Sequence, residues 1–402
     1  MTPAAIAEKK TTPNVGGIGC ESDAIETAPL SAERSFAYWQ QDIPREYWDL
    51  DAPALTARIA EARNKLGTRL IVLGHHYQRE DIIAFADLRG DSFKLAQFAA
   101  EHPESEYIVF CGVHFMAEAA DILSAPHQKV MLPNMAAGCS MADMADPDDV
   151  FSAWAEMEEL GIAQDTMPIT YMNSAAALKA FVGEHGGAVC TSSNARKVME
   201  WAFAQKKRVL FFPDQHLGRN TGDAMGIPLD EMVLWGWSRP YGSMGGRTLE
   251  ELGQSRVLLW AGHCSVHQRF TPAQIDEARA KYPDITVIVH PECRYETVQA
   301  SDLNGSTEFI AKTIANAPAG SKFAVGTEIN LVARLARENP DKTVFCLDPV
   351  VCPCSTMYRV HPAYLAWTIE SLAEGRVVNQ VIVPEAITAN AKIALDRMLA
   401  IK

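Results

Sequence analysis

The sequence contains no apolar run that approaches the roughly 18 residues of a membrane-spanning helix. Basic residues are also few: 36 Lys and Arg stand against 50 Asp and Glu, a formal net charge of −14 over 402 residues. This balance argues against a nucleic-acid-binding protein, which needs a basic face for phosphate. Residues 1–30 lack the basic and apolar regions of a secretory signal. We therefore expect a cytoplasmic protein that binds neither nucleic acid nor membrane.

Signatures of nucleotide and zinc binding are absent as well. No G-x-G-x-x-G or P-loop lysine motif occurs, so the sequence does not support dinucleotide or ATP binding. His75-His76 does not form the His-Glu-x-x-His pattern of zinc proteases. The spacer of Cys352-Pro353-Cys354 is too short for a zinc knuckle.

Cysteine, in contrast, is abundant. Nine cysteines are an odd number in a chain without a secretory signal, so we expect no disulfide framework. Cys111, Cys190 and Cys346 lie within apolar strand patterns, and we interpret them as small buried hydrophobic residues. The others are Cys20, Cys139, Cys264, Cys293, Cys352 and Cys354.

From about residue 52 the chain alternates helical segments with short apolar strands. Predicted helices include 54–65, 93–100 and 175–181. The predicted strands are 70–73, 107–110, 130–132, 168–170, 188–190, 208–212, 257–260, 285–289, 323–325 and 343–347. Apolar strands between helices indicate parallel βαβ units with both sheet faces covered, so the predicted fold class is α/β.

The alternation divides into three α/β units that follow an N-terminal extension, and each unit closes near a cysteine. The helical stretch 364–399 is expected to pack back on the first unit. The segment from about 219 to 252, rich in Gly and Met, is expected to be an insertion or a lid. The predicted boundaries are 1–48 for the extension, 49–139 completed by 355–402, 140–264, and 265–354.

Polar pairs follow the first strand of each unit. They are His75 and Tyr77, Tyr171 and Asn173, and His290 and Glu292. Open parallel sheets bind ligands beyond the carboxyl ends of their strands. Residues two apart in extended chain point to the same side. Each pair can therefore face one central cavity, although three unrelated strand-end loops would show the same spacing.

Three of the cysteines, Cys139, Cys264 and Cys354, lie one per unit at distant loops. This arrangement suits a cuboidal iron–sulfur cluster better than a zinc site. Such a cluster normally takes four cysteines. With three, one iron keeps an open position and acts as a Lewis acid on a substrate oxygen.

Taken in order, the motifs resemble those of the quinolinate synthase A family, in a longer form with an insertion, across about residues 54 to 370. The first half carries Gly74-His75-His76-Tyr77-Gln78, Asp91-Ser92, Cys111-Gly112-Val113-His114-Phe115-Met116-Ala117-Glu118, Gly138-Cys139-Ser140-Met141, Tyr171-Met172-Asn173-Ser174 and Thr191-Ser192-Ser193. The second half carries Pro213-Asp214 with Leu217-Gly218, Gly262-His263-Cys264-Ser265-Val266-His267, His290-Pro291-Glu292, Gly305-Ser306-Thr307 and Cys354-Ser355-Thr356-Met357.

The resemblance implies three αβα domains with short parallel sheets, in a pseudo-threefold arrangement around a central [4Fe–4S] cluster. It implies condensation of iminosuccinate (iminoaspartate) with dihydroxyacetone phosphate to quinolinate, phosphate and water, a step of de novo NAD biosynthesis. The partner that supplies iminosuccinate would be an aspartate oxidase or dehydrogenase.

Carried over by position, the cluster ligands fall on Cys139, Cys264 and Cys354, which leaves one iron open. The implied substrate contacts are His75, Ser92, Tyr171, Met172, Asn173, Ser192, His290, Pro291, Glu292 and Thr307. Tyr77 and His267 match positions that also line the family's cavity. Among the catalytic candidates His75, Tyr77, Tyr171, His267 and Glu292, we expect Tyr77 and Glu292 to transfer protons and Tyr171 to orient substrate. Asp214 and Glu328 are interpreted as structural.

Two other functional classes remain open at this point. One is another [4Fe–4S]-dependent dehydratase of small carboxylic acids, and the other is a non-enzymatic iron–sulfur redox sensor or carrier. Cys293 directly follows Glu292 and is not expected to bind iron. Cys352 is interpreted as a spare thiol that can pair with Cys354 when the cluster is lost.

Overall fold

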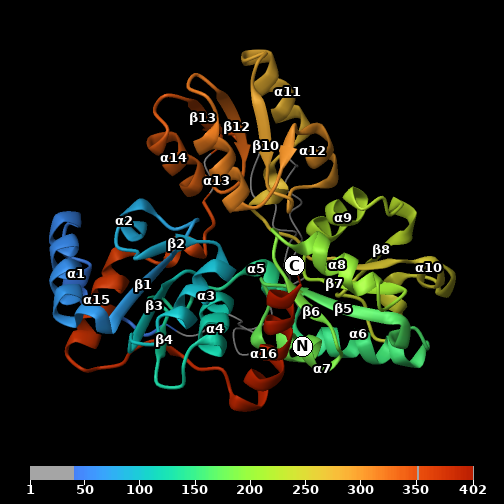
Figure 1. Ribbon diagram of the computed structural model, residues 1–402, viewed down its shortest axis with the longest axis horizontal. Helices are drawn as coiled ribbons and strands as arrows, with labels where there is room; N and C mark the ends of the chain where they lie inside the picture. Colours follow the sequence, from blue (N-terminus) through green and yellow to red (C-terminus); the bar gives the residue numbers. More distant parts are fainter. Residues whose placement is uncertain (1–39, 351–352, 402) are drawn as a thin grey trace, which may run out of the picture. The chain divides into compact units, whose positions relative to one another are not determined.

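The computed structural model describes residues 40–350 and 353–401, which form three separate, mainly parallel sheets (Figure 1). The first sheet contains β1 (Leu70–His75), β2 (Leu88–Gly90), β3 (Tyr107–Cys111), β4 (Lys129–Met131) and β14 (Gln380–Val381). The second contains β5 (Thr166–Tyr171), β6 (Ala188–Cys190), β7 (Arg208–Phe212), β8 (Met232–Trp235) and β9 (Val257–Trp260). The third contains β10 (Thr286–Val289), β11 (Leu303–Asn304), β12 (Lys322–Gly326) and β13 (Thr343–Cys346). The predicted α/β class with short parallel sheets is confirmed.

The three sheets share one strand order. In each, the first strand lies between the second and the third, and β4, β9 or β13 lies beside the third: β2-β1-β3-β4, β6-β5-β7-β9 and β11-β10-β12-β13. β14, antiparallel to β4, extends the first sheet, and β8, parallel to β9, extends the second. The strand order of such a sheet reverses between its first and third strands, which opens a ligand crevice at their carboxyl ends. This order places β1, β5 and β10 at crevices.

The apolar runs in the sequence become strands because both faces of each sheet are covered. Every residue of β1, β3, β5 and β7 is buried. The edge strand β13 is only partly buried. The helices around the first sheet are α1 (Ala52–Leu66), α2 (Glu80–Ile83), α3 (Ser92–Glu101), α4 (His114–Leu123) and α15 (Pro362–Ala373). Those around the second are α5 (Ser140–Asp143), α6 (Pro147–Glu159), α7 (Ala176–Glu184), α8 (Ala195–Phe203), α9 (Gln215–Ala224), α10 (Leu249–Gln254) and α16 (Glu385–Ala400), and those around the third are α11 (Pro272–Lys281), α12 (Tyr295–Ala300), α13 (Thr307–Asn316) and α14 (Ile329–Glu338).

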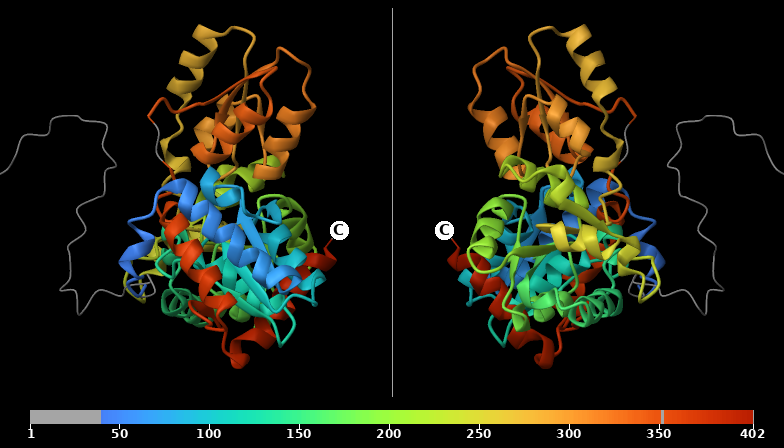
Figure 2. Two further views of the ribbon diagram at one scale, coloured as in Figure 1. Left: turned by 90° about the vertical axis from the view of Figure 1, so that its left-hand side faces the viewer. Right: turned by 90° about the vertical axis from the view of Figure 1, so that its right-hand side faces the viewer.

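The C-terminal segment packs against two sheets, whereas the sequence predicted packing on the first unit. α15 lies beside α1, as Figures 1 and 2 both show, and the Arg58 guanidinium donates to the Glu370 carboxylate across this contact. α16 packs instead against α7 and β6 of the second sheet. Gly183 permits this approach, because a Cβ there would lie 2.0 Å from the Asn390 carbonyl oxygen.

Residues 219–252 are built into the second sheet and do not form a lid. They supply the end of α9, the edge strand β8 and the start of α10. β8 pairs with β9 from Met232 to Trp235. None of these residues lines the cavity described below.

Apolar packing is continuous between the first two sheets. One buried cluster extends from Ile43 to Met398 and includes side chains of both sheets, α15 and α16. The third sheet has two smaller clusters of its own.

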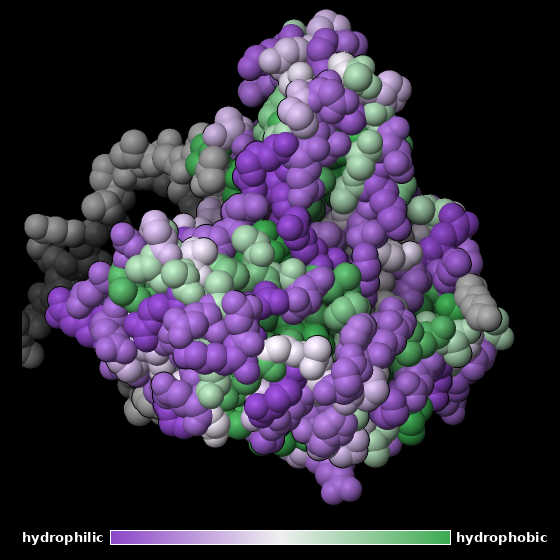
Figure 3. Space-filling model, turned by 60° about the vertical axis from the view of Figure 1, so that its left-hand side comes forward, coloured by the Kyte–Doolittle hydropathy of each residue, from purple (hydrophilic) through white to green (hydrophobic). Residues whose placement is uncertain are grey.

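The face drawn in Figure 3 is mostly hydrophilic, with apolar residues in small groups. No helix in residues 40–350 or 353–401 is long and apolar enough to cross a membrane.

Candidate active site

One cavity gathers the carboxyl ends of strands from all three sheets. Of the residues proposed from the sequence, it is lined by His75, Tyr77, Ser92, Cys139, Tyr171, Met172, Asn173, Ser192, Cys264, His290, Glu292, Thr307 and Cys354. All three strand-end pairs face it, so the interpretation as unrelated loops is wrong. Pro291 and His267 do not line it. His267 contacts the cavity-lining Glu292, with Nδ1 2.8 Å from Glu292 Oε2.

His75 and His290 are held by the same local contact in different sheets. The Tyr77 amide donates to His75 Nδ1 at 3.2 Å, and the Glu292 amide donates to His290 Nδ1 at 3.3 Å. Because Nδ1 accepts in both rings, the proton of the neutral imidazole is assigned to Nε2. Burial lowers the pKa of His75 well below its usual value and that of His290 to about 3. Both rings are therefore neutral N–H donors near pH 7.

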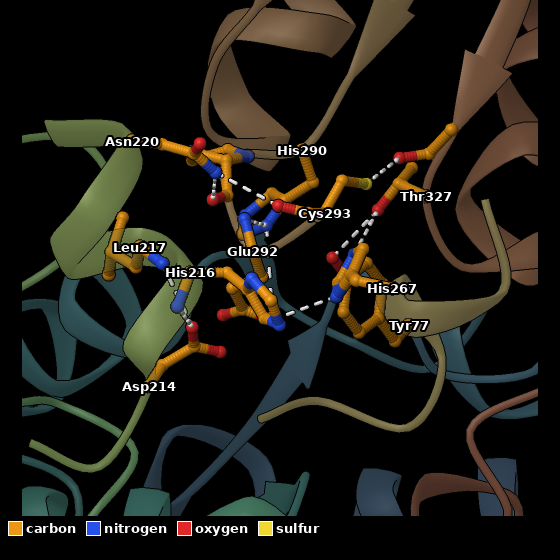
Figure 4. A network of polar contacts seen from close by, with 12 residues as sticks. Tyr77, Asp214, His216, Leu217, Asn220, His267, His290, Glu292, Cys293 and Thr327 are labelled. Carbon is orange, nitrogen blue, oxygen red and sulfur yellow. Dashed lines mark hydrogen bonds and ion pairs between the residues drawn. The ribbon is translucent and has the colours of Figure 1, made fainter. Parts of the chain in front are cut away.

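Glu292 is the centre of a buried network (Figure 4). Its Oε2 lies 2.8 Å from His267 Nδ1 and 3.9 Å from His290 Nδ1, and it accepts a hydrogen bond from Tyr171. Burial alone would raise the pKa of Glu292, but His290, His267 and Tyr171 together lower it to about 2. The cavity thus contains a buried carboxylate that is ionised.

Thr327 connects the network to Tyr77. Its Oγ1 lies 2.9 Å from the Tyr77 hydroxyl and 3.1 Å from His267 Nε2. Burial raises the pKa of Tyr77, and likewise that of Tyr171, well above 10. Both phenols are therefore protonated donors. The sequence analysis did not identify Thr327, since a buried Thr after a strand has no distinctive pattern.

Ser92 and Thr307 lie at helix starts. Asp91 caps α3 and Ser306 caps α13, so Ser92 and Thr307 occupy the first helical positions, where free amides and the helix dipole favour anions. Ser192 instead lies in the turn before α8. The cavity is thus lined by two helix N-termini from different sheets.

The three cysteine thiols share one backbone motif. The amide three residues on donates to the sulfur in each case: Ala142 to Cys139, His267 to Cys264, and Met357 to Cys354. The amide four residues on donates to each cysteine carbonyl oxygen, at 3.0, 3.1 and 2.9 Å. A sequence signal marks this motif, because these are the three cysteines of the chain that precede a serine. The motif presents all three sulfurs to one cavity.

The other described cysteines lie away from this motif. Cys293 is fully buried in the core of the third sheet, where its Sγ contacts the Gly326 carbonyl oxygen at 3.6 Å. Cys111 and Cys190 are buried on strands, as predicted, whereas Cys346 is half-buried at the end of an edge strand. Cys20 and Cys352 lie outside the described residues, so the spare-thiol interpretation of Cys352 stays a prediction.

Asp214 and Glu328 cap helices. Asp214 Oδ1 accepts from the amides of His216 and Leu217 at the start of α9. Glu328 caps α14 and also accepts from the Cys354 amide at 3.3 Å. Glu328 therefore positions the chain at Cys354 from a different loop.

A buried lysine supports the cavity wall between the first two sheets. Lys179 on α7 is fully buried, and its ammonium donates to the carbonyl oxygen of Ser174, directly after the Tyr171–Asn173 loop. Glu118 on α4 accepts from the Ala176 amide at 3.1 Å. Burial lowers the pKa of Lys179 to about 8 and raises that of Glu118 to about 7. The sequence analysis missed Lys179, because a lysine on a helix is normally exposed.

The family model described as Quinolinate synthetase A protein matches residues 57–400. A protein of Corynebacterium glutamicum named quinolinate synthase is 57% identical over 389 residues, which cover 97% of this chain and 96% of that protein. Proteins with the same name from Herpetosiphon aurantiacus and Streptomyces coelicolor are 56% and 54% identical, over 89% and 87% of this chain and 95% and 89% of their own lengths.

Proposed function

The chain belongs to the quinolinate synthase family of enzymes, and from that membership we propose that it condenses iminosuccinate with dihydroxyacetone phosphate to quinolinate, phosphate and water in NAD biosynthesis. The observation that supports this most is the single cavity into which strand ends of three sheets bring His75, Tyr171 and Glu292. Iminosuccinate would come from a reaction that oxidises aspartate.

Cys139, Cys264 and Cys354 are proposed to hold a [4Fe–4S] cluster. The fit rests on three sulfurs at one cavity, each accepting a backbone N–H, an interaction that tunes such clusters. When bound with three thiolates, the cluster supplies an iron with an open position that acts as a Lewis acid. The three units predicted from the sequence would then surround it, with α16 bridging the first and second.

The substrate anions are assigned to the helix starts and neutral donors. Ser92 and Thr307 offer hydroxyl groups and free helix amides to phosphate or carboxylate groups. His75 and His290 present Nε2–H to substrate oxygens without adding charge. These neutral donors would hold the two substrates without determining which substrate groups are protonated.

The proton transfers are assigned to Glu292 and Tyr77. Glu292 is ionised and accepts a proton from the carbon or nitrogen that loses it. Tyr77 is protonated and donates a proton to substrate. Its hydroxyl contacts Thr327 Oγ1, which separates it from the His267–Glu292 pair. Tyr171 orients Glu292 through its hydrogen bond while its ring lines the cavity.

The test is product formation by the full chain purified without oxygen. Iminosuccinate and dihydroxyacetone phosphate are supplied, and quinolinate is measured. Quinolinate is the expected product. Dehydration of another carboxylic acid without quinolinate would favour the dehydratase alternative, and cluster transfer to an acceptor protein without turnover would favour the carrier.

The ligand assignment is tested by iron content. Cys354→Ser is expected to lose iron and turnover, because two thiolates do not hold the cluster. Cys352→Ser, the matched neighbour, is expected to keep both under anaerobic conditions. Loss of iron from Cys352→Ser alone would move the ligand by two residues.

A further inference from the structure

Among the described residues, one group of three metal-ligating side chains has its donor atoms close together. Cys264, His267 and Glu292 each place one ligand atom within 4.8 Å of the others. His267 and Glu292 are buried, and Cys264 and Glu292 line the cavity. The group contains one sulfur, one nitrogen and one oxygen donor, the three donor types that zinc takes from proteins.

A second observation points to a ligand at this group. His267 Nδ1 is buried and lies 2.8 Å from Glu292 Oε2, so the nitrogen and oxygen donor atoms of the group already face each other. The other ring nitrogen is held by Thr327 Oγ1 at 3.1 Å. A metal-binding histidine is typically oriented in this way, with one ring nitrogen hydrogen-bonded and the other directed at the remaining ligands.

We propose that the cluster-free chain binds one Zn²⁺ through Cys264 Sγ, His267 Nδ1 and Glu292 Oε2. One thiolate and one carboxylate balance the two positive charges, so the buried site carries no net charge. Cavity water takes the fourth position, since Cys264 and Glu292 both face the cavity. The Cys264 thiol and the His267 ring belong to one turn, whose carbonyl–amide contact joins Cys264 to Gln268 at 3.1 Å.

This site excludes the proposed cluster, because both use the Cys264 sulfur. Zinc on the cluster-free chain is therefore expected to block loading with iron and sulfide until a chelator removes it. This consequence rests on the proposed function, whereas the zinc site itself rests only on the three side chains.

The experiment measures Co²⁺ binding by the full chain isolated free of iron and sulfide, with Zn²⁺ as competitor. One Co²⁺ per chain is expected, with a sulfur-to-cobalt absorption band and the intense visible bands of four-coordinate cobalt. Zn²⁺ should displace it. The readout is spectroscopic, so it does not depend on whether quinolinate is formed.

Variants separate this site from the three-thiol site. Cys139→Ser is expected to keep Co²⁺ and to lose the cluster, whereas His267→Ala is expected to lose Co²⁺ and still load iron and sulfide, which shows that it is folded. Thr327→Val removes the contact to His267 Nε2 and should lower the affinity for Co²⁺ by about 10- to 100-fold. Equal Co²⁺ binding by His267→Ala, or its loss in Cys139→Ser, would overturn the proposal.

Discussion

At the scale of single residues, the cavity combines the ionised carboxylate of Glu292 with histidine and tyrosine donors that carry no charge. The amide contacts to Nδ1 set the tautomer of His75 and His290, and burial keeps both neutral. Glu292 keeps its charge because His290, His267 and Tyr171 together lower its pKa. The residue types at these positions were predictable from the strand-end pairs, but their protonation depends on burial and on contacts between sheets.

Glu292→Gln keeps the shape of the side chain but removes the proton acceptor. Turnover to quinolinate is expected to fall by about 10²- to 10⁴-fold, as for lost general acid–base catalysis. Iron content should not change, since Glu292 is not a proposed cluster ligand. Steady-state kinetics and iron analysis on the same preparation check this, and full activity would assign Glu292 a structural role.

His290 makes the free energy of unfolding depend on pH. The unfolded chain binds a proton at this ring near pH 6.5, whereas burial lowers its pKa to about 3 in the folded chain. The unfolded state therefore binds more protons in this window, and stability falls as pH decreases from about 6.5. When the pH falls from 7 to 4.5, the free energy of unfolding of the parent chain should decrease by on the order of 2 kcal/mol more than that of His290→Gln.

Denaturant unfolding at the two pH values measures this difference. The neighbouring Glu292 is common to both chains. Since its pKa lies at about 2, it stays ionised in the folded chain throughout this range. An identical pH dependence in the two chains would show that His290 is already protonated in the folded state.

At the scale of elements, α4 and α7 are joined by buried polar groups where apolar packing would be usual. The Lys179 ammonium of α7 donates a hydrogen bond to the Ser174 carbonyl oxygen. The Glu118 carboxylate of α4 accepts one from the first amide of α7. Phe115 of α4 lines the cavity and lies 5.6 Å from the Lys179 ammonium, measured to its ring centroid. The contact fixes the loop that carries Tyr171 and Asn173 against the first sheet.

Lys179→Met removes this charged hydrogen bond while keeping much of the side-chain volume. Stability is expected to fall by about 2–3 kcal/mol, since a charged donor to Ser174 is lost and Glu118 can take up a proton. The Michaelis constant for iminosuccinate should rise more than turnover falls, because the Tyr171–Asn173 loop loses its support. Lys197→Met, on the exposed face of α8, is the control and should change stability by less than about 0.5 kcal/mol. Equal effects of both variants would contradict a positioning role for Lys179.

Elements with strong local patterns were predicted well, and those that depend on distant partners were not. The strands 188–190, 208–212 and 257–260 have the predicted bounds, because fully buried strands form nearly continuous apolar runs, interrupted here only by Arg208. β11 and β14 have two residues each, too few for any period. β8 lies in a Gly-rich segment and becomes a strand only through its pairing with β9.

At the scale of the whole molecule, the site belongs to no single sheet. The first two sheets share one apolar core, the third has its own, and Cys264 and Cys354 pack against both. Tyr77 and Glu292, the residues proposed to transfer protons, come from the first and third sheets, and Tyr171 comes from the second. The order of motifs in the sequence indicated the set of site residues, but the contacts between sheets required the structure.

The central claim is that this cavity makes quinolinate only with iron at its three thiols. The direct measurement is quinolinate turnover as a function of iron bound per chain, on protein loaded stepwise with iron and sulfide without oxygen. Turnover is expected to be absent in the iron-free chain and to rise with loading until about four iron are bound. Equal turnover without iron, or a fully loaded chain that forms no quinolinate from both substrates, would contradict the account.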